Sequence, residues 1–269
     1  MTYKRDRLRV RREFKRLMRQ YQEIFYYSCE VDRWLPEITL IPYVTLNWEQ
    51  VPVWCRIIAP PSSGKSAHLS LLDGYTKTYM LDEFTTKCFV SGYRGQNEDP
   101  SKLPQMDDKV MVITDESTIM EQRSEERNMI QAVLRKAYDG SIRKAFGNIK
   151  DVVEHKAHFN MLVAATPVID RYYHYNQALG ERFLNYRLQI PNRKALTERA
   201  IHNQRHRYKQ HHIQLQRAVH LFLKRMPRTT INSVKLPRSI QDMFVECASF
   251  VALARTHVAR DVTGRQVIA

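Results

Sequence analysis

An apolar run followed by a loop of small residues is the part of this sequence best suited to chemistry. Residues 51–58 (VPVWCRII) read as a buried strand, and residues 59–66 follow as APPSSGKS. This matches the phosphate-binding pattern Gly-x-x-x-x-Gly-Lys-Ser/Thr at every fixed position but the first, where Ala59 replaces glycine. Backbone N–H groups of such a loop, and the helix that follows it, point at phosphates. The pattern predicts binding of a nucleoside triphosphate; the alternative is a chance turn before a helix.

Each loop residue has an expected role. The ammonium of Lys65 would contact the phosphates of ATP, and the hydroxyl of Ser66 would ligate Mg²⁺. The residues expected to hold the nucleotide are Pro61, Ser62, Ser63, Gly64, Lys65 and Ser66.

A second apolar run ends in two carboxylates. Residues 109–114 (KVMVIT) precede Asp115 and Glu116, and continuous apolar runs of this kind are typical of parallel strands buried on both faces. Placed beside the strand of the loop, Asp115 would hold Mg²⁺ and Glu116 would polarise the attacking water as a general base. The alternative is an ordinary strand that ends in a solvated acidic pair.

A third apolar run, residues 158–165, ends at the polar residue Thr166, at the edge where open α/β sheets bind ligands. The segment ALGERF follows at residues 178–183. This order of parts resembles the AAA+ ATPases, and the resemblance implies that Thr166 is a sensor residue and that Arg182 is an arginine finger. Such a finger neutralises transition-state charge in the neighbouring subunit's site. The alternative for Arg182 is a surface ion pair with Glu181 or Asp170.

More narrowly, residues 51–188 resemble AAA+ proteins encoded by phages and mobile elements. The shared motifs include PPSSGKS, VMVITD, TPVIDR and LGERF, and they cover about half of the chain. The resemblance implies an α/β fold of the P-loop NTPase type, with a parallel sheet sandwiched by helices and a helical lid. It also implies a homo-oligomeric ring, a hexamer. Two departures are Ala59 in the loop and Glu116, where an apolar residue is more usual.

The charge distribution fits a nucleic-acid partner. The chain has 43 Lys and Arg against 28 Asp and Glu, a net charge of +15. Residues 1–20 hold nine basic residues, and residues 191–228 hold ten with five histidines against Glu198 alone. Clustered basic residues of this kind favour contact with phosphate backbones, and we expect the partner to be DNA.

Residues 138–150 predict a β-hairpin between a helix and the strand that ends at Thr166. Turn residues occur at 139–140 and 147–148, with extended segments between and after them. In helicases of the resembled family, hairpins placed here track DNA in a central pore. This implies DNA contacts by Arg143, Lys144, Lys150 and Lys156. A solvated polar hairpin is the alternative.

Three regions are expected: an N-terminal basic helix and linker (1–50), the AAA+ core (51–190) and a helical lid (191–269). The helix at 4–28 carries an apolar stripe that we expect to dock on the core, at Phe14, Leu17, Met18, Tyr21 and Phe25. Pro36, Pro42 and Pro52 indicate a linker after it. Long lid helices are expected around 194–225 and 239–256.

Several site classes are disfavoured. The four cysteines are widely spaced, which argues against a zinc site or a disulfide framework. His202 and His206 lie four residues apart, but no third ligand is suitably spaced, so we expect no metal there. No apolar run is long enough for a membrane span, and the first residues do not resemble a signal peptide. We therefore expect no membrane partner and a cytoplasmic location.

Three classes of protein could use ATP with these motifs. The first is a ring-forming helicase or replication initiator, and the second is an ATP-dependent switch that recruits replication or transposition proteins without unwinding DNA. The third, a small-molecule kinase, needs neither a trans-acting arginine nor a pore hairpin.

Overall fold

The computed structural model describes residues 2–25, 34–48, 51–91, 100–147, 151–172, 182–189, 194, 197–198, 201, 208–227 and 235–254. The chain divides into two compact units, Met1–Thr229 and Thr230–Ala269. The element described in the second unit is α11 (Arg238–Ala254). Among the described helices, none is long and apolar enough to cross a membrane.

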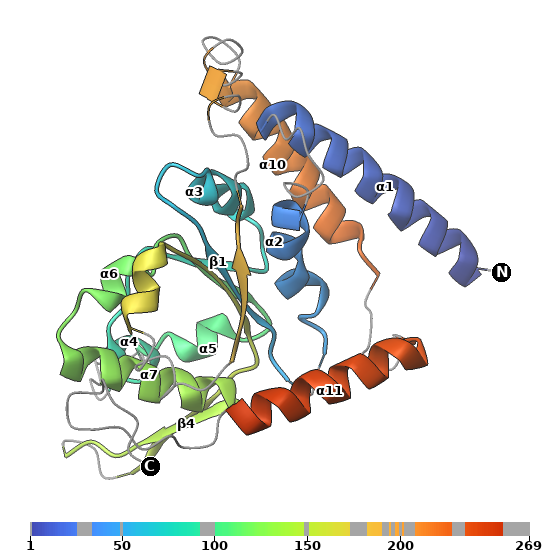
Figure 1. The fold of residues 1–269 in the computed structure, drawn as a ribbon. Helices are drawn as coiled ribbons and strands as arrows, with labels where there is room; N and C mark the ends of the chain where they lie inside the picture. The colour runs from blue at the N-terminus through green and yellow to red at the C-terminus, as the bar shows by residue number, and fades with distance from the viewer. Residues whose placement is uncertain are drawn as a thin grey trace. The chain divides into compact units, whose positions relative to one another are not determined.

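The first unit is built on a sheet of five parallel strands in the order β2-β3-β6-β1-β7 (Figure 1). The strands are β1 (Trp54–Ile58), β2 (Thr78–Leu81), β3 (Val110–Ile113), β6 (Asn160–Ala165) and β7 (Phe183–Arg187). Every residue of β1, β3 and β6 is buried, as their continuous apolar sequences predict. The predicted parallel α/β sheet flanked by helices is confirmed. The strand of Asp115 is not the direct neighbour of β1, because β6 lies between them.

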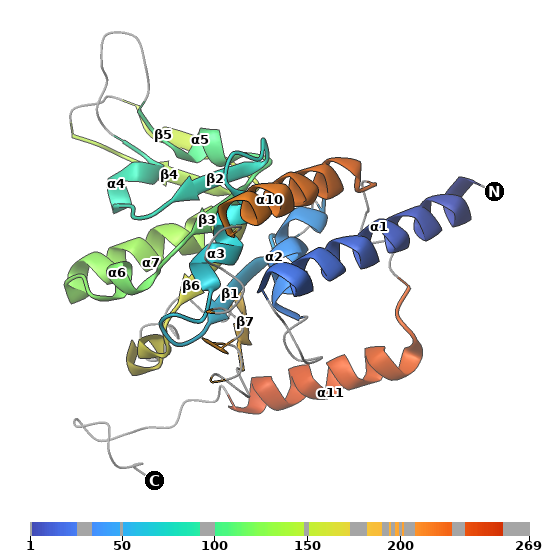
Figure 2. The same cartoon turned by 90° about the horizontal axis from the view of Figure 1, so that it is seen from above.

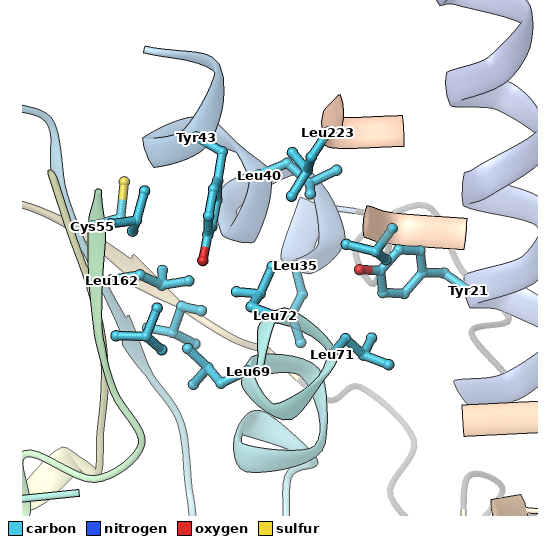
Figure 3. Packing of buried hydrophobic residues seen from close by; sticks show 14 of the residues in the cluster. Tyr21, Leu35, Leu40, Tyr43, Cys55, Leu69, Leu71, Leu72, Leu162 and Leu223 are labelled. Atoms are coloured by element: carbon cyan, nitrogen blue, oxygen red, sulfur yellow. The ribbon is translucent and has the colours of Figure 1, made fainter. Parts of the chain in front are cut away.

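Helices cover both faces of this sheet (Figures 1 and 2). One face is covered by α2 (Trp34–Val44), α3 (Lys65–Leu69) with its 3-10 extension η2 (Ser70–Leu72), and α10 (Tyr208–Arg225), and α1 (Thr2–Phe25) packs on α10. Figure 3 shows this core, in which leucines from α2, η2 and α10 meet Cys55 and Leu162 of the sheet. The other face packs against α4 (Thr86–Phe89), α5 (Leu103–Met106) and α7 (Ser124–Tyr138).

The apolar stripe of α1 docks as predicted. Leu17 and Tyr21 are buried in the core, and Phe14, Met18 and Phe25 pack against it. The basic residues of α1 from Arg9 to Arg19 are exposed, because the 3.6-residue period of the helix separates them from the apolar stripe. The last three residues of the predicted helix lie outside the described residues.

The linker predicted before β1 is partly wrong, because α2 is a helix despite its two prolines. Pro36 lies in the first turn, where its missing N–H has no intrahelical acceptor to lose. Pro42 is tolerated near the end of the helix, and its carbonyl accepts a hydrogen bond of 2.6 Å from Nδ2 of the buried Asn160. The Oδ1 of Asn160 accepts from the N–H of Val53 at 2.7 Å, so one amide connects α2, β6 and the entry to β1.

A β-hairpin is present as predicted, although its second strand lies beyond the predicted range of 138–150. β4 (Ser141–Lys144) pairs antiparallel with β5 (Val153–Lys156), directly after α7 and before β6. Two short elements follow the carboxyl ends of β3 and β6, namely α6 (Ser117–Met120) and η3 (Pro167–Tyr172). The segment predicted as a lid is not one unit, since α10 packs in the first unit while α11 belongs to the second.

Candidate nucleotide site at the carboxyl edge of the sheet

The loop between β1 and α3 has the backbone shape of an anion-binding nest. Ser62 and Gly64 have φ angles of 59° and 84°, and such left-handed residues turn successive N–H groups toward one point. A left-handed φ favours glycine at position 64. Ala59 is not among the residues with positive φ, so alanine fits the first position of the pattern without strain. Its N–H donates to the carbonyl of Ala165 at 3.1 Å, which fixes the start of the loop on β6.

The ammonium of Lys65 lies inside the curve of this loop. Its Nζ donates to the carbonyl of Ala59 at 2.7 Å and to that of Pro60 at 3.1 Å. Burial lowers the pKa of Lys65, while the nearby carboxylate of Asp115 acts in the opposite direction. Lys65 begins α3 directly after the β1 loop, and Asp115 follows β3 at the same edge of the sheet.

Two predicted polar residues, Asp115 and Thr166, lie at the same edge as the loop, and Ser117 connects them. Asp115 is exposed after β3, and its Oδ1 accepts a hydrogen bond of 2.9 Å from the N–H of Ser117. The hydroxyl of Ser117 lies 3.1 Å from that of Thr166, which follows β6. Because β6 lies between β1 and β3, Thr166 sits between the loop and Asp115.

These donors fit a magnesium nucleotide. Mg²⁺ in nucleotide sites is typically held by one or two carboxylates together with phosphate oxygens and waters, and needs no cage of protein ligands. Asp115 and the exposed Ser66 supply one carboxylate and one hydroxyl. Within the described ranges no cluster of three or more His, Cys, Asp or Glu could hold a metal ion. His202 and His206 lie outside the described residues.

Glu116, predicted as the general base, is buried, and both of its carboxylate oxygens bind Arg56. Its Oε2 and Oε1 accept from Nε and Nη2 of Arg56 at 2.7 and 2.8 Å. Both side chains are buried, with exposed fractions of 6% and 5%. A base that activates water needs direct reach to it. We therefore assign Glu116 to a buried ion pair and do not propose it as the base.

Arg56 explains why this pair exists. It is the charged residue of the apolar strand β1, and its side chain points to the face covered by α7. There it also lies 4.0 Å from the ring centroid of Phe183 and 3.4 Å from Oδ1 of Asn185. A buried charge requires a partner, so an arginine within an apolar strand was the signal in the sequence for this contact.

Arg182 lies at the amino edge of the sheet, opposite the carboxyl edge that carries the β1–α3 loop. It directly precedes β7, whose first residue pairs with Trp54 at the amino end of β1. The guanidinium contacts Asp139 at 3.7 Å and lies 5.1 Å from the ring centroid of Tyr138. The predicted alternatives were ion pairs with Glu181, which lies outside the described residues, or with Asp170. Asp170 instead binds both terminal nitrogens of Arg187, at 2.7 and 3.0 Å.

The hairpin residues predicted to contact DNA are only partly available. Arg143 pairs with Glu154 of the facing strand at 3.0 Å, which offsets its charge. Nζ of Lys144 lies 5.3 Å from the ring centroid of Phe146, and Lys156 is exposed. Lys150 lies outside the described residues. The β4–β5 hairpin is found at the end of the sheet away from α3 (Figure 1).

His68, one turn into α3, was not anticipated from the sequence. It is buried between α1 and the loop, with its ring stacked on Phe25 at 3.9 Å and on Tyr21 at 5.8 Å between centroids. Nδ1 lies 2.9 Å from the carbonyl of Gly64, so this nitrogen carries the proton and donates it. Burial lowers the pKa of His68 to about 4.

The far end of the same helix is held by α10. Nε2 of His212 lies 2.9 Å from the hydroxyl of Ser70, and Nε2 of His220 lies 3.0 Å from the carbonyl of Leu71. Gln216, between them on the same helical face, donates to the carbonyls of Ser70 and Asp73 at 3.3 and 3.1 Å. The helix after the loop is therefore fixed at one end by α1 and at the other by α10.

The buried His68 should make stability depend on acidity. Its pKa is about 4 in the folded chain and 6.5 as a free side chain, so the unfolded state takes up the proton first. The stability from neutral His68 is complete above pH 6.5 and is lost as the pH falls toward 4, by about 3 kcal/mol. His68→Asn keeps an N–H donor but cannot titrate. Urea denaturation at pH 7 and pH 4 should show a smaller acid loss for this variant than for wild type; equal losses would contradict the assignment.

Comparison with known proteins does not assign this chain to a family. No family model matches the chain, and no curated protein matches it.

Proposed function

We propose that this chain is an oligomeric DNA-binding ATPase of the P-loop, AAA+ type, with Mg²⁺ as its cofactor. We propose further that it acts in the replication of a phage or mobile element, as a helicase or initiator. The observation that carries the nucleotide part is the meeting of the left-handed loop, the ammonium of Lys65 and the carboxylate of Asp115 at one sheet edge.

In this proposal each residue of the site has a separate role toward ATP. Loop N–H groups and Lys65 bind the phosphates, and bound Mg²⁺, held by Ser66 and Asp115, would offset the charge that develops during phosphoryl transfer. Thr166, hydrogen-bonded to Ser117, is positioned between them to orient the terminal phosphate or the attacking water. The DNA partner rests on the net charge of +15 and its clustering, and the biological setting rests on the resemblance of residues 51–188.

The proposed oligomer follows from Arg182. This residue lies at the amino end of β7, so it could serve only the nucleotide of a neighbouring subunit. Head-to-tail interfaces of this kind close into rings or continue as filaments. In such an assembly the guanidinium of Arg182 would leave Asp139 and contact the phosphates of the nucleotide bound by the neighbouring subunit.

Mixing two inactive variants should restore hydrolysis. Arg182→Ala and Lys65→Ala should each be inactive alone, because one lacks the finger and the other lacks the phosphate contact. In a mixture, some interfaces join an intact loop to an intact finger, and phosphate release should reappear. Wild-type turnover per subunit should also rise with protein concentration. A monomer in ATP and DNA that hydrolyses at a concentration-independent rate would refute the trans-acting arginine.

The second candidate is an ATP-dependent switch or matchmaker without unwinding activity. The buried Arg56–Glu116 pair favours it, because the carboxylate at the position expected for the general base is held by Arg56 and no other described residue is assigned as the base. A strand-displacement assay separates the two candidates. A helicase releases a labelled strand when ATP is added, whereas a switch binds DNA and ATP without releasing it.

A further inference from the structure

The solvent face of α1 is strongly basic. Six of its described side chains are exposed and cationic. Apart from Arg9, none of them makes an ion pair among the described residues: Arg11, Arg12, Lys15, Arg16 and Arg19. The acidic Glu13 is half-buried and lies 3.6 Å from Arg225 of α10. Glu23 is the remaining acidic residue of the described side chains of α1.

α10 extends this surface, because it packs alongside α1 (Figure 2). The rings of Phe14 and Phe222 lie 5.8 Å apart between the helices. A hollow of about 150 Å³ separates their outer edges, with Arg16 and Gln20 on one side and Leu221 and Arg225 on the other. The exposed Arg217 and Lys224 add further positive charge on α10.

The spacing of the α1 cations suits a polyphosphate chain. Eight residues separate Arg11 from Arg19, about 12 Å along a helix that rises 1.5 Å per residue. Each strand of duplex DNA carries a phosphate about every 3.4 Å along its axis. The face could therefore contact about three or four successive phosphates. Such contacts position a nucleic acid without reading its sequence.

The surface is also fixed to the nucleotide loop. On its inner side α1 stacks Tyr21 and Phe25 on His68, which donates to the carbonyl of Gly64. α10 in turn binds the backbone of Ser70 and Leu71 at the end of the same short helix. A shift of either helix would move the groups that surround the phosphates.

We infer that the solvent face of α1, extended by α10, is the principal site at which this chain binds the phosphodiester backbone of nucleic acid. This inference rests on the proposed function and assigns its DNA contact to α1 and α10 instead of the hairpin, where Glu154 offsets the charge of Arg143. Because both helices contact residues next to the loop, we expect binding of nucleic acid and of ATP to be linked, each then changing the affinity of the other by the same factor.

The test is a triple substitution, Arg12→Gln with Arg16→Gln and Arg19→Gln, which keeps good helix formers in α1. Binding of labelled single-stranded and duplex DNA is measured by fluorescence anisotropy across a salt series. We expect Kd to rise at least about tenfold, and the slope of log K against log salt to flatten by about two to three for duplex. The larger change on one of the two DNAs identifies the preferred form.

The matched control removes the same charge from α7 and its N-cap residue, by Arg123→Gln, Arg135→Gln and Lys136→Gln, and should bind DNA like wild type. Circular dichroism checks that both variants keep their helix content. If the α1 variant binds DNA as tightly as the α7 control, the inference is overturned while the proposed ATPase stands. If wild type fails to bind ATP, the proposed function fails irrespective of DNA. If wild type binds anionic phospholipid vesicles but neither single-stranded nor duplex DNA, the surface is a membrane-binding surface and the inference is overturned.

Discussion

ATP should bind the Lys65→Ala variant about 100-fold more weakly than wild type, with no loss of the fold. A charged hydrogen bond to phosphate contributes up to about 3 kcal/mol, and Lys65 is the cation inside the loop. The substitution removes this charge without opening the apolar core, because Nζ contacts only loop carbonyls. Isothermal titration with ATP and Mg²⁺ measures the affinity, and a thermal melt checks the fold.

Asp115→Asn is the matched comparison at the same edge of the sheet. It keeps the size and hydrogen-bonding capacity of the side chain but removes the negative charge expected to hold Mg²⁺. Hydrolysis should therefore fall far more than ATP affinity. Unchanged affinity in the Lys65→Ala variant would show that the loop does not bind the nucleotide.

The second large effect is expected at the buried pair of Arg56 and Glu116. Glu116→Ala would leave the guanidinium of Arg56 buried without its carboxylate, which costs about 3–5 kcal/mol. At roughly 2–4 °C per kcal/mol for a chain of this size, the melting temperature should fall by about 10 °C. Replacing both partners by apolar residues, Arg56→Met with Glu116→Leu, should recover most of the loss.

Glu116→Gln separates this structural role from the catalytic one predicted from the sequence. A structural role predicts a destabilised variant, because a neutral amide replaces the carboxylate that Arg56 binds at both oxygens. A catalytic base predicts a variant as stable as wild type that binds ATP and does not turn it over. The second outcome would show that Glu116 is the general base.

The loop and the strands were predictable because each is encoded locally. The APPSSGKS segment carries its own turn residues, and the apolar runs before Asp115 and Thr166 are long enough to read as buried strands. The hairpin and the docking stripe of α1 were likewise visible, in turn residues and in helical spacing.

The misassigned residues depend on neighbours that are distant in sequence. Glu116 looked like a free carboxylate because nothing nearby in the chain reveals that β1 brings Arg56 to it. From the sequence alone Pro42 looked like a helix breaker. The hydrogen bond that its carbonyl accepts from Asn160 arises only in the folded chain. His68 shows no local signal either, since its stacking partners lie on α1.

The position of β1 in the sheet has a consequence for synthesis on the ribosome. β1 pairs with β6 and β7, and contacts such as that of Arg56 with Asn185 span 129 positions. The apolar strand that carries the loop therefore leaves the exit tunnel long before either neighbour has been translated. Such long-range pairing is slow to form and leaves edges open to aggregation. The nascent chain should acquire nucleotide affinity only after β7 has emerged, so chaperone protection of β1 would be needed until late in translation.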